Sequence, residues 1–177
     1  VSASADVRTI YMFDGSTANK LKPFQHSSLT AAEKAHLDVS TWPDPALKLS
    51  SWAGLNPAGQ TAGRSPDALV NFLRGQTGLE DDSGNADIPF RGRETPLGDI
   101  VNAETVYSKK SPFQYADAGH ESFVTTTVTR QGLLFAAAND GMLHAINSDT
   151  GREMWAYVPT AVIPRLYELA DKNYVHE

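Results

Sequence analysis

The hydrophobic pattern of the chain changes near its middle. Residues 1–96 place short apolar helical patterns between polar loops rich in Pro, Gly and Ser. Residues 97–177 carry short runs of β-branched, aromatic and aliphatic residues between turn residues, and they end in a short helical pattern. This division predicts a mainly β fold, with one strand, short helices and long loops in the N-terminal part.

The N-terminal part contains one strand pattern and one helix start. Residues 8–13 are β-branched and aromatic, and a turn at 14–16 follows them, so they predict a strand. Thr30 and Glu33 have the spacing of a capping box, in which each side chain bonds the other residue's free amide. A short helix to about Leu37 is therefore expected.

A second helix is predicted over residues 65–75. The segment begins with Ser-Pro, its apolar positions follow a helical period, and Gly75 stands where a left-handed C-terminal glycine belongs. Residues 42–64 hold three prolines and predict irregular structure, and the polar residues 78–94 predict an exposed loop.

Residues 123–158 hold four consecutive strand patterns. The turn between the second and third, Asn139-Asp140-Gly141, predicts a primed hairpin, because these residues tolerate positive φ. Four antiparallel strands joined by tight turns form one blade of a β-propeller, although a plain antiparallel meander has the same hairpins. Further strand patterns precede the blade at 97–101 and 105–107. The four strand patterns are 123–129, 133–138, 142–146 and 153–158.

Composition narrows the functional classes. The chain has 15 basic and 21 acidic residues and a net charge of −6, which disfavours nucleic acid as a partner. It has no cysteine, so disulfides, thiolate catalysis and Cys-based zinc sites are excluded. The longest apolar run, 133–138, is far shorter than a membrane span. The opening Val-Ser-Ala does not have the pattern of a signal peptide, and the absence of an initial Met favours a mature or trimmed chain.

Residues 145–155 resemble the tryptophan-docking motif of quinoprotein-type propellers, in which an indole braces the blade against its neighbour. Asn147 stands where that family usually has Asp, and it keeps the side-chain acceptor while losing the charge. The motif indicates a blade and carries no chemistry of its own. The matching positions are Ala145, Thr150, Gly151 and Trp155.

The resemblance extends over nearly the whole chain. Eight segments, in the same order, are similar to the C-terminal propeller domain of the PilC/PilY family of type IV pilus tip adhesins. They are residues 11–15, 29–33, 69–75, 90–93, 97–102, 138–145, 155–159 and 164–166. A propeller of about seven blades needs roughly 40–45 residues for each blade, so this chain resembles the opening segment of such a domain.

The family resemblance implies a non-enzymatic protein at the tip of a type IV pilus, outside the cell, reached through the periplasm and outer membrane. Its expected roles are pilus assembly, pilus retraction and adhesion. The implied partners are minor pilins or other tip components, the host-cell surface, and the remainder of the propeller. The family's calcium loop, an Asp-x-Asp-x-Asn run, is not matched here, so no cofactor is expected in this segment.

An isolated blade leaves open sheet edges, which invite pairing with another chain. We therefore expect that the chain associates with itself or a partner, or that its N-terminal half covers the open sheet. Two other classes use the same repeat. One is a pyrroloquinoline-quinone-dependent dehydrogenase, which usually carries a vicinal disulfide that this chain lacks. The other is a periplasmic assembly scaffold, in which the repeat recurs several times.

Two charged segments offer candidate binding groups. A loop carries four oxygen-bearing side chains that could bind calcium, but it lacks EF-hand spacing, so a solvated acidic loop is favoured. Those side chains are Asp81, Asp82, Asn85 and Asp87. Arg91 and Arg93 could hold a carboxylate, and a structural salt bridge or a solvated turn is favoured over that function.

The remaining candidates have a structural interpretation that is favoured over the functional one. The five histidines lack zinc-site spacing, and His144 is expected to pack or to form hydrogen bonds in a strand. Asp99 and Asp140 could form a carboxylate pair for glycoside cleavage, but they stand at turns. Six aromatic residues could cover a binding face, with core packing as the favoured alternative: Trp42, Trp52, Tyr107, Phe113, Tyr115 and Tyr157. The histidines are at positions 26, 36, 120, 144 and 176.

Overall fold

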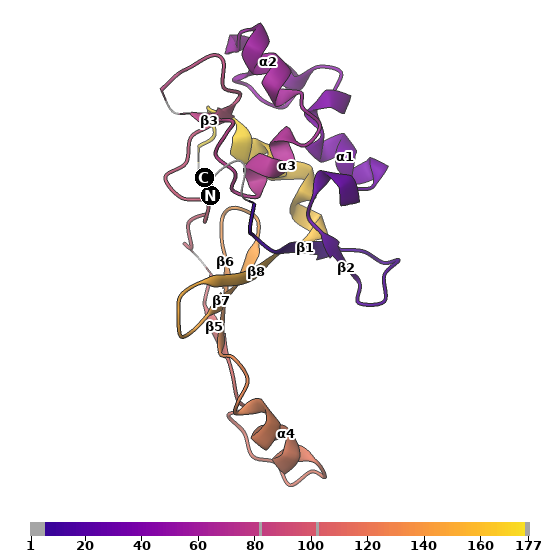
Figure 1. The fold of residues 1–177 in the computed structure, drawn as a ribbon, viewed down its shortest axis with the longest axis vertical. Helices are drawn as coiled ribbons and strands as arrows, with labels where there is room; N and C mark the ends of the chain where they lie inside the picture. Colours follow the sequence, from indigo (N-terminus) through magenta and orange to yellow (C-terminus); the bar gives the residue numbers. More distant parts are fainter. Residues whose placement is uncertain (1–5, 82, 102, 176–177) are drawn as a thin grey trace.

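The computed structural model describes residues 6–81, 83–101 and 103–175 (Figure 1). Asp82, His176 and the three opening residues therefore lie outside the described part. The strands are β1 Ile10–Phe13, β2 Leu21–Pro23, β3 Glu80–Asp81, β4 Phe90–Arg91, β5 Val106–Ser108, β6 Leu133–Ala137, β7 Leu143–Asn147 and β8 Glu153–Val158. The α-helices are α1 Ala31–Leu37, α2 Pro57–Gly63, α3 Ala68–Leu73 and α4 His120–Thr127. The 3-10 helices are η1 His26–Ser28, η2 Val39–Thr41, η3 Pro45–Leu47, η4 Trp52–Gly54 and η5 Thr160–Ala170.

Six strands form one mixed sheet in the order β2-β1-β8-β7-β6-β5. Neighbouring strands are antiparallel except β1 and β8, which run parallel. The N-terminal part therefore covers the β8 edge with its own strand, and β2 and β5 are the two edges of this sheet. A separate two-residue parallel ladder joins β3 to β4.

The predicted helix start is present in α1, whereas the start predicted at Ser65-Pro66 is wrong, because α3 begins at Ala68 and Asp67 before it makes no side-chain cap bond. In α1 the Thr30 hydroxyl accepts from the Glu33 amide at 3.3 Å, and the Glu33 carboxylate accepts from the Thr30 amide at 2.7 Å. The α3 helix ends as predicted at Gly75, which has a φ of +91°. Its amide donates to the Phe72 carbonyl at 2.8 Å, and the next amide donates to the Asn71 carbonyl, a Schellman end.

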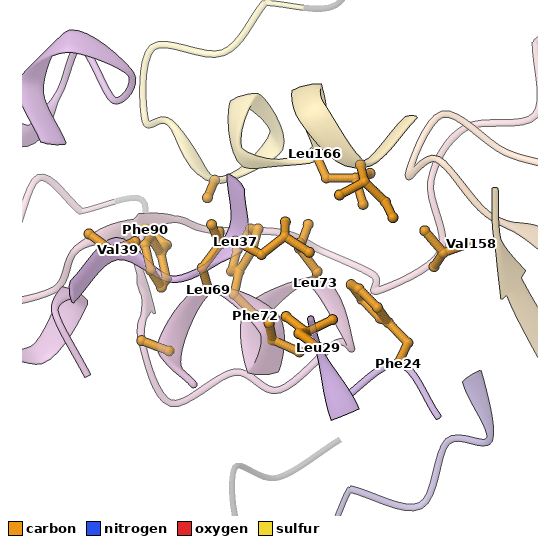
Figure 2. Close-up of a cluster of buried hydrophobic side chains, with 14 of the residues drawn as sticks. Phe24, Leu29, Leu37, Val39, Leu69, Phe72, Leu73, Phe90, Val158 and Leu166 are labelled. Carbon is orange, nitrogen blue, oxygen red and sulfur yellow. The ribbon is translucent and has the colours of Figure 1, made fainter. Parts of the chain in front are cut away.

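The main hydrophobic core joins the helices to one face of the sheet. Side chains from α1, α3 and η5 pack with β1 and β8, and Figure 2 shows Phe24, Leu37, Phe72, Val158 and Leu166 converging there. We call this sheet face the inner face. Six of its side chains are at most 2% exposed: Ile10, Met12, Ala136, His144, Ala156 and Val158.

The predicted strand at 123–129 is wrong, because these residues lie mostly in α4. The β6 edge that they would pair with is occupied by β5, which begins one residue after the start of the predicted strand 105–107. Within α4 the threonine hydroxyls bond backbone carbonyls one turn earlier, with Thr125 donating to Glu121 at 2.9 Å and Thr126 to Ser122 at 2.8 Å. The strands predicted at 133–138, 142–146 and 153–158 are confirmed as β6, β7 and β8 within one residue.

Three other expectations also need correction. Residues 42–64 are not wholly irregular, because they contain α2, which Asn56 caps through a bond from the Gly59 amide and which begins at Pro57. Residues 78–94 are not wholly an exposed loop, because they form β3 and β4, and Phe90 is fully buried. Residues 97–101 form no strand. The helix expected at 164–166 is present within η5.

None of the helices in the described residues combines the length and the apolar character that a bilayer crossing requires.

Candidate functional site

The sheet face opposite the inner face is apolar, and we call it the outer face. Strand register places its side chains in two cross-strand rows. Several of these side chains are open to solvent, with Val106 58% exposed. The first row is Val106, Phe135, Ala145 and Trp155, and the second is Ala137, Leu143, Tyr157 and Tyr11.

The first row depends on the small side chain of Ala145. It lies between Phe135 and Trp155 and is 0% exposed, although it belongs to the outer face. The Phe135 and Trp155 rings flank it, with centroids 5.8 Å apart. A larger side chain at this position would force the two rings apart, so the small residue is what lets them meet.

Asn147 organises the turn between β7 and β8. Its side-chain oxygen accepts from the amides of Asp149 at 2.9 Å and Thr150 at 3.1 Å. Gly151 then takes a φ of +69° and donates to the Asn147 carbonyl at 2.9 Å. The two amides that bond the Asn147 side chain need an acceptor oxygen but no negative charge, so Asn is sufficient at this position.

The predicted primed turn between β6 and β7 is wrong. Gly141 has a φ of +80°, but Asn139 and Asp140 do not have positive φ, which a primed turn of type I′ requires at both central residues. Gly141 donates to the Ala138 carbonyl at 3.1 Å, as expected for a turn that ends in a left-handed glycine. A Cβ on Gly141 would also lie 2.6 Å from the Leu166 side chain.

Residues 97–99 lie across this turn, which explains why they do not pair as a strand. The Asp99 carbonyl accepts from the Asn139 amide at 3.0 Å, and the Gly98 amide donates to the Asp140 carboxylate at 3.4 Å. A Cβ on Gly98 would lie only 2.4 Å from the Asp140 nitrogen. The two segments therefore approach as closely as a glycine allows.

A buried charge cluster stands behind the same turn, on the inner face. The two ring nitrogens of His144 contact different carboxylates, Nδ1 to Glu153 at 2.8 Å and Nε2 to Asp140 at 3.1 Å. Arg8 pairs with the same Glu153 carboxylate at 2.8 Å. Glu153 is therefore half-buried and paired twice.

The cluster holds fixed charges at neutral pH. Burial disfavours the charged ring, but hydrogen bonds to Asp140 and Glu153 outweigh it and raise the pKa of His144 to about 9. Burial likewise disfavours the Glu153 carboxylate, yet hydrogen bonds from His144 and Arg8 lower its pKa to about 2. The prediction that His144 forms hydrogen bonds within a strand agrees with this geometry.

Two arginines connect this cluster to the helical layer. The Arg8 guanidinium donates to the Arg74 carbonyl at 3.1 Å, and the Arg74 guanidinium donates back to the Arg8 carbonyl at 2.7 Å. Arg74 also bonds the Phe24 carbonyl and the Asp6 carboxylate. No sequence spacing indicates these contacts, because they join residues 50 or more positions apart.

A cleft of about 320 Å³ lies beside the turn, and both Asp99 and Asp140 line it. Asp140 already accepts from His144 and the Met142 amide, so it is committed to holding the turn. Arg93 forms the expected salt bridge, with Glu80 at 2.6 Å. Its guanidinium also lies 3.8 Å from the centre of the Phe72 ring.

The other candidates do not converge on one site. Asp81 accepts from the Ser83 hydroxyl and the Asn85 amide, and no metal-ligating group of three or more is present in the described residues. The six aromatic residues separate: Trp42 and Trp52 are buried, Tyr157 lies on the outer face, and Tyr107, Phe113 and Tyr115 are exposed. His26 pairs with Asp38 at 2.8 Å.

Comparisons with known proteins place this architecture in a family. The chain is 34% identical over 166 residues to a type IV pilus biogenesis factor PilY1 homolog of Xylella fastidiosa, covering 89% of the chain. It is 29% identical over 177 residues to the type IV pilus biogenesis factor PilY1 of Pseudomonas aeruginosa strain UCBPP-PA14, covering 94% of the chain. The chain belongs to the PilY1 family. It spans 13% of the length of each of these relatives.

The family assignment agrees with the resemblance drawn from the sequence segments. A search against protein-family models finds no match, and a search of solved structures finds none either. A second PilY1 homolog of Xylella fastidiosa is 37% identical over 124 residues, which is 63% of the chain and 8% of that relative.

Proposed function

We propose that this chain is a structural segment of a type IV pilus biogenesis factor, in which β5 to β8 form one blade of a modified β-propeller. Three features support the blade: four consecutive antiparallel strands, a turn held by Asn147, and an indole at Trp155 on the last strand. Membership of the PilY1 family supports the pilus role.

The observation that carries the proposal is the outer face. Except for the buried Ala145, the apolar side chains of the two rows there are half-buried or exposed, and Trp155 stacks only with Phe135 among the described aromatic rings. A soluble domain rarely leaves such a surface without a function. In the complete protein, the neighbouring blade would pack against this face and cover the indole.

The role of the segment is then that of a rigid, non-enzymatic scaffold. Two of the charged groups that line the cleft, Asp140 and Arg93, are engaged in holding the fold. A rigid scaffold supports pilus assembly, retraction or adhesion by presenting loops to minor pilins, other tip components or a host surface. In this proposal the segment acts at the cell surface, on the pilus tip.

The proposal is tested with two matched leucine substitutions in a complete PilY1-family protein. Leu143→Asp puts a charge on the outer face, whereas Leu47→Asp puts it on η3 at a side chain that is 84% exposed. We expect Leu143→Asp to abolish surface pili and twitching motility, and Leu47→Asp to leave both unchanged. Circular dichroism of the 177-residue variants separates a lost contact from a lost fold. Normal piliation by Leu143→Asp would contradict the proposal.

The dehydrogenase alternative has its own test. Pyrroloquinoline quinone and calcium are added to the purified chain, and the absorbance spectrum is recorded. The scaffold proposal predicts no protein-dependent quinone band, and a saturable band would favour the alternative.

A further inference from the structure

Two segments that precede β6 both have the sequence of a strand. One is β5, which pairs with β6 through Val106, Tyr107 and Ser108. The other is residues 123–129, Phe-Val-Thr-Thr-Thr-Val-Thr, which are uncharged, β-branched or aromatic throughout, and contain no proline. In the structure the second segment is mostly helical, so the strand preference of its residues and its observed helical conformation disagree.

The β5 strand holds its place with few contacts. It pairs with β6 over three residues and has no strand on its other side in the described sheet. Val106 and Tyr107 are each 58% exposed, so neither contributes much burial. A short edge strand of this kind is easily displaced.

The α4 helix gains little from its surroundings. It begins at Gly119, which has a φ of +87° and supplies no side-chain cap, and Thr127 is its one buried residue. Figure 1 shows α4 at the far end of the molecule from α1, α2 and α3. A helix of eight residues without tertiary packing is marginal in water, and β-branched residues weaken it further.

Contacts within the excursion between β5 and β6 favour the helical state. The rings of Phe113, Tyr115, His120 and Phe123 follow one another at centroid separations of 5.9, 5.0 and 6.1 Å. Arg130 donates to the Lys109 carbonyl and ties the two ends of the excursion together. These contacts lie among exposed side chains, so each contributes little to the stability of the helical state.

The two segments cannot use the β6 edge together. Residues 130–132, Arg-Gln-Gly, separate 123–129 from β6, and three residues are enough to close a β-hairpin. The other β6 edge is taken by β7 over five residue pairs. If residues 123–129 pair with β6 as a hairpin, they therefore take the edge that β5 now occupies, and β5 must leave.

We propose that β5 and residues 123–129 compete for this one edge of β6, so that the excursion is a two-state element. In one state β5 is paired and α4 presents its aromatic rings. In the other, residues 123–129 form a longer edge strand and the β5 segment is released. Each state leaves a different surface at the sheet edge, which gives the protein two alternative faces for a partner.

The test uses a disulfide that locks β5 in place. The chain has no cysteine, so Tyr107→Cys with Leu134→Cys gives a single bridge between directly paired residues. Cα chemical shifts of residues 123–129 are measured in the 177-residue chain, in the oxidised double variant and in the same variant after reduction. Tyr107→Gly serves as a second variant, because it weakens β5 without a cross-link.

The proposal predicts three linked results. Oxidation moves the Cα shifts of 123–129 toward helical values, reduction returns them toward strand values, and Tyr107→Gly moves them further toward strand values than in the parent chain. Unchanged shifts at His144 and Ala145 show that the rest of the sheet is intact. Shifts that are the same in the oxidised and reduced forms, or that do not respond to Tyr107→Gly, would overturn the proposal.

Discussion

Ala145 and Trp155 are direct cross-strand partners on β7 and β8, and the alanine is fully buried beside the indole. The indole and Phe135 come together across that small side chain, with ring centroids 5.8 Å apart. This arrangement gives a physical reason for a small residue and a tryptophan at a fixed spacing. The indole itself is only half-buried in this arrangement.

Enlarging Ala145 should therefore destabilise the sheet. Ala145→Leu adds a branched side chain where the two rings meet, and overpacking of this kind costs about 1–3 kcal/mol. Urea unfolding followed by circular dichroism measures the change. Ala137→Leu is the matched control, because Ala137 lies on the same face and is exposed, and its unfolding free energy should stay within about 0.5 kcal/mol of the parent. Equal losses for both variants would contradict the role given to Ala145.

The turn after β7 depends on an acceptor and not on a charge. Asn147→Ala removes the oxygen that binds two backbone amides and should lower the unfolding free energy by about 1 kcal/mol. Asn147→Asp keeps an oxygen in the same place, so its unfolding free energy should stay within about 0.5 kcal/mol of the parent. Urea midpoints of the two variants test this difference, and a larger loss for Asp than for Ala would refute the interpretation.

Residues 97–99 pack closely on the β6–β7 turn, so any side chain larger than glycine at position 98 should lower the stability of the protein. A Cβ there would lie 2.4 Å from the Asp140 nitrogen, so Gly98→Ala must displace one segment, at about 1–3 kcal/mol. Gly54→Ala is the control, since nothing lies within 4 Å of its Cβ position. Thermal unfolding of the two variants should show a lower midpoint for Gly98→Ala alone. A similar midpoint in both would mean that the two segments separate without cost.

The buried charge cluster makes stability depend on pH at both ends of the range. The pKa of His144 is raised from 6.5 to about 9, so its contribution is complete below pH 6.5 and is lost as the pH rises to about 9. The pKa of Glu153 is lowered from 4.5 to about 2, so its contribution is complete above pH 4.5 and is lost as the pH falls toward 2. Stability should therefore be highest between pH 4.5 and 6.5.

Urea unfolding at pH 5.5, 7.5 and 9.5 measures the alkaline side of this dependence. The parent chain should lose stability across the three values, and His144→Gln, which cannot titrate, should lose much less over the same interval. If the parent and His144→Gln decline equally, the alkaline loss comes from other groups and the pKa of His144 is not raised.

Local sequence signals predicted the elements whose cause is local. The capping box at Thr30, the left-handed Gly75 and the strand that carries Trp155 follow from neighbouring residues, and the structure contains all three. The α2 helix is not predicted, although Asn56 followed by Pro57 is a helix start, because the prolines of this segment also favour irregular structure.

Interactions between segments that are far apart in the sequence explain why the sheet is only partly predicted. Residues 123–129 have strand composition, yet β5 holds the edge they would need, and no local pattern shows which segment wins. The pairing of Glu153 with Arg8 is equally hidden, because the partners are 145 positions apart and meet only when β1 aligns with β8. Ala145 and Trp155 of the outer face belong to the docking motif, whereas the other members of the two rows and their exposure are visible only in the structure.

Oxidative footprinting tests the central claim most directly. Hydroxyl radicals modify exposed aromatic side chains, and mass spectrometry compares Trp155 and Phe135 in the isolated 177-residue chain with the same residues in a complete PilY1-family protein containing it. Phe113, which is 60% exposed and outside the sheet, is the internal reference. We predict that oxidation of Trp155 falls strongly in the complete protein relative to Phe113. Equal oxidation of Trp155 in both proteins would show that nothing covers the outer face, and the blade assignment would be contradicted.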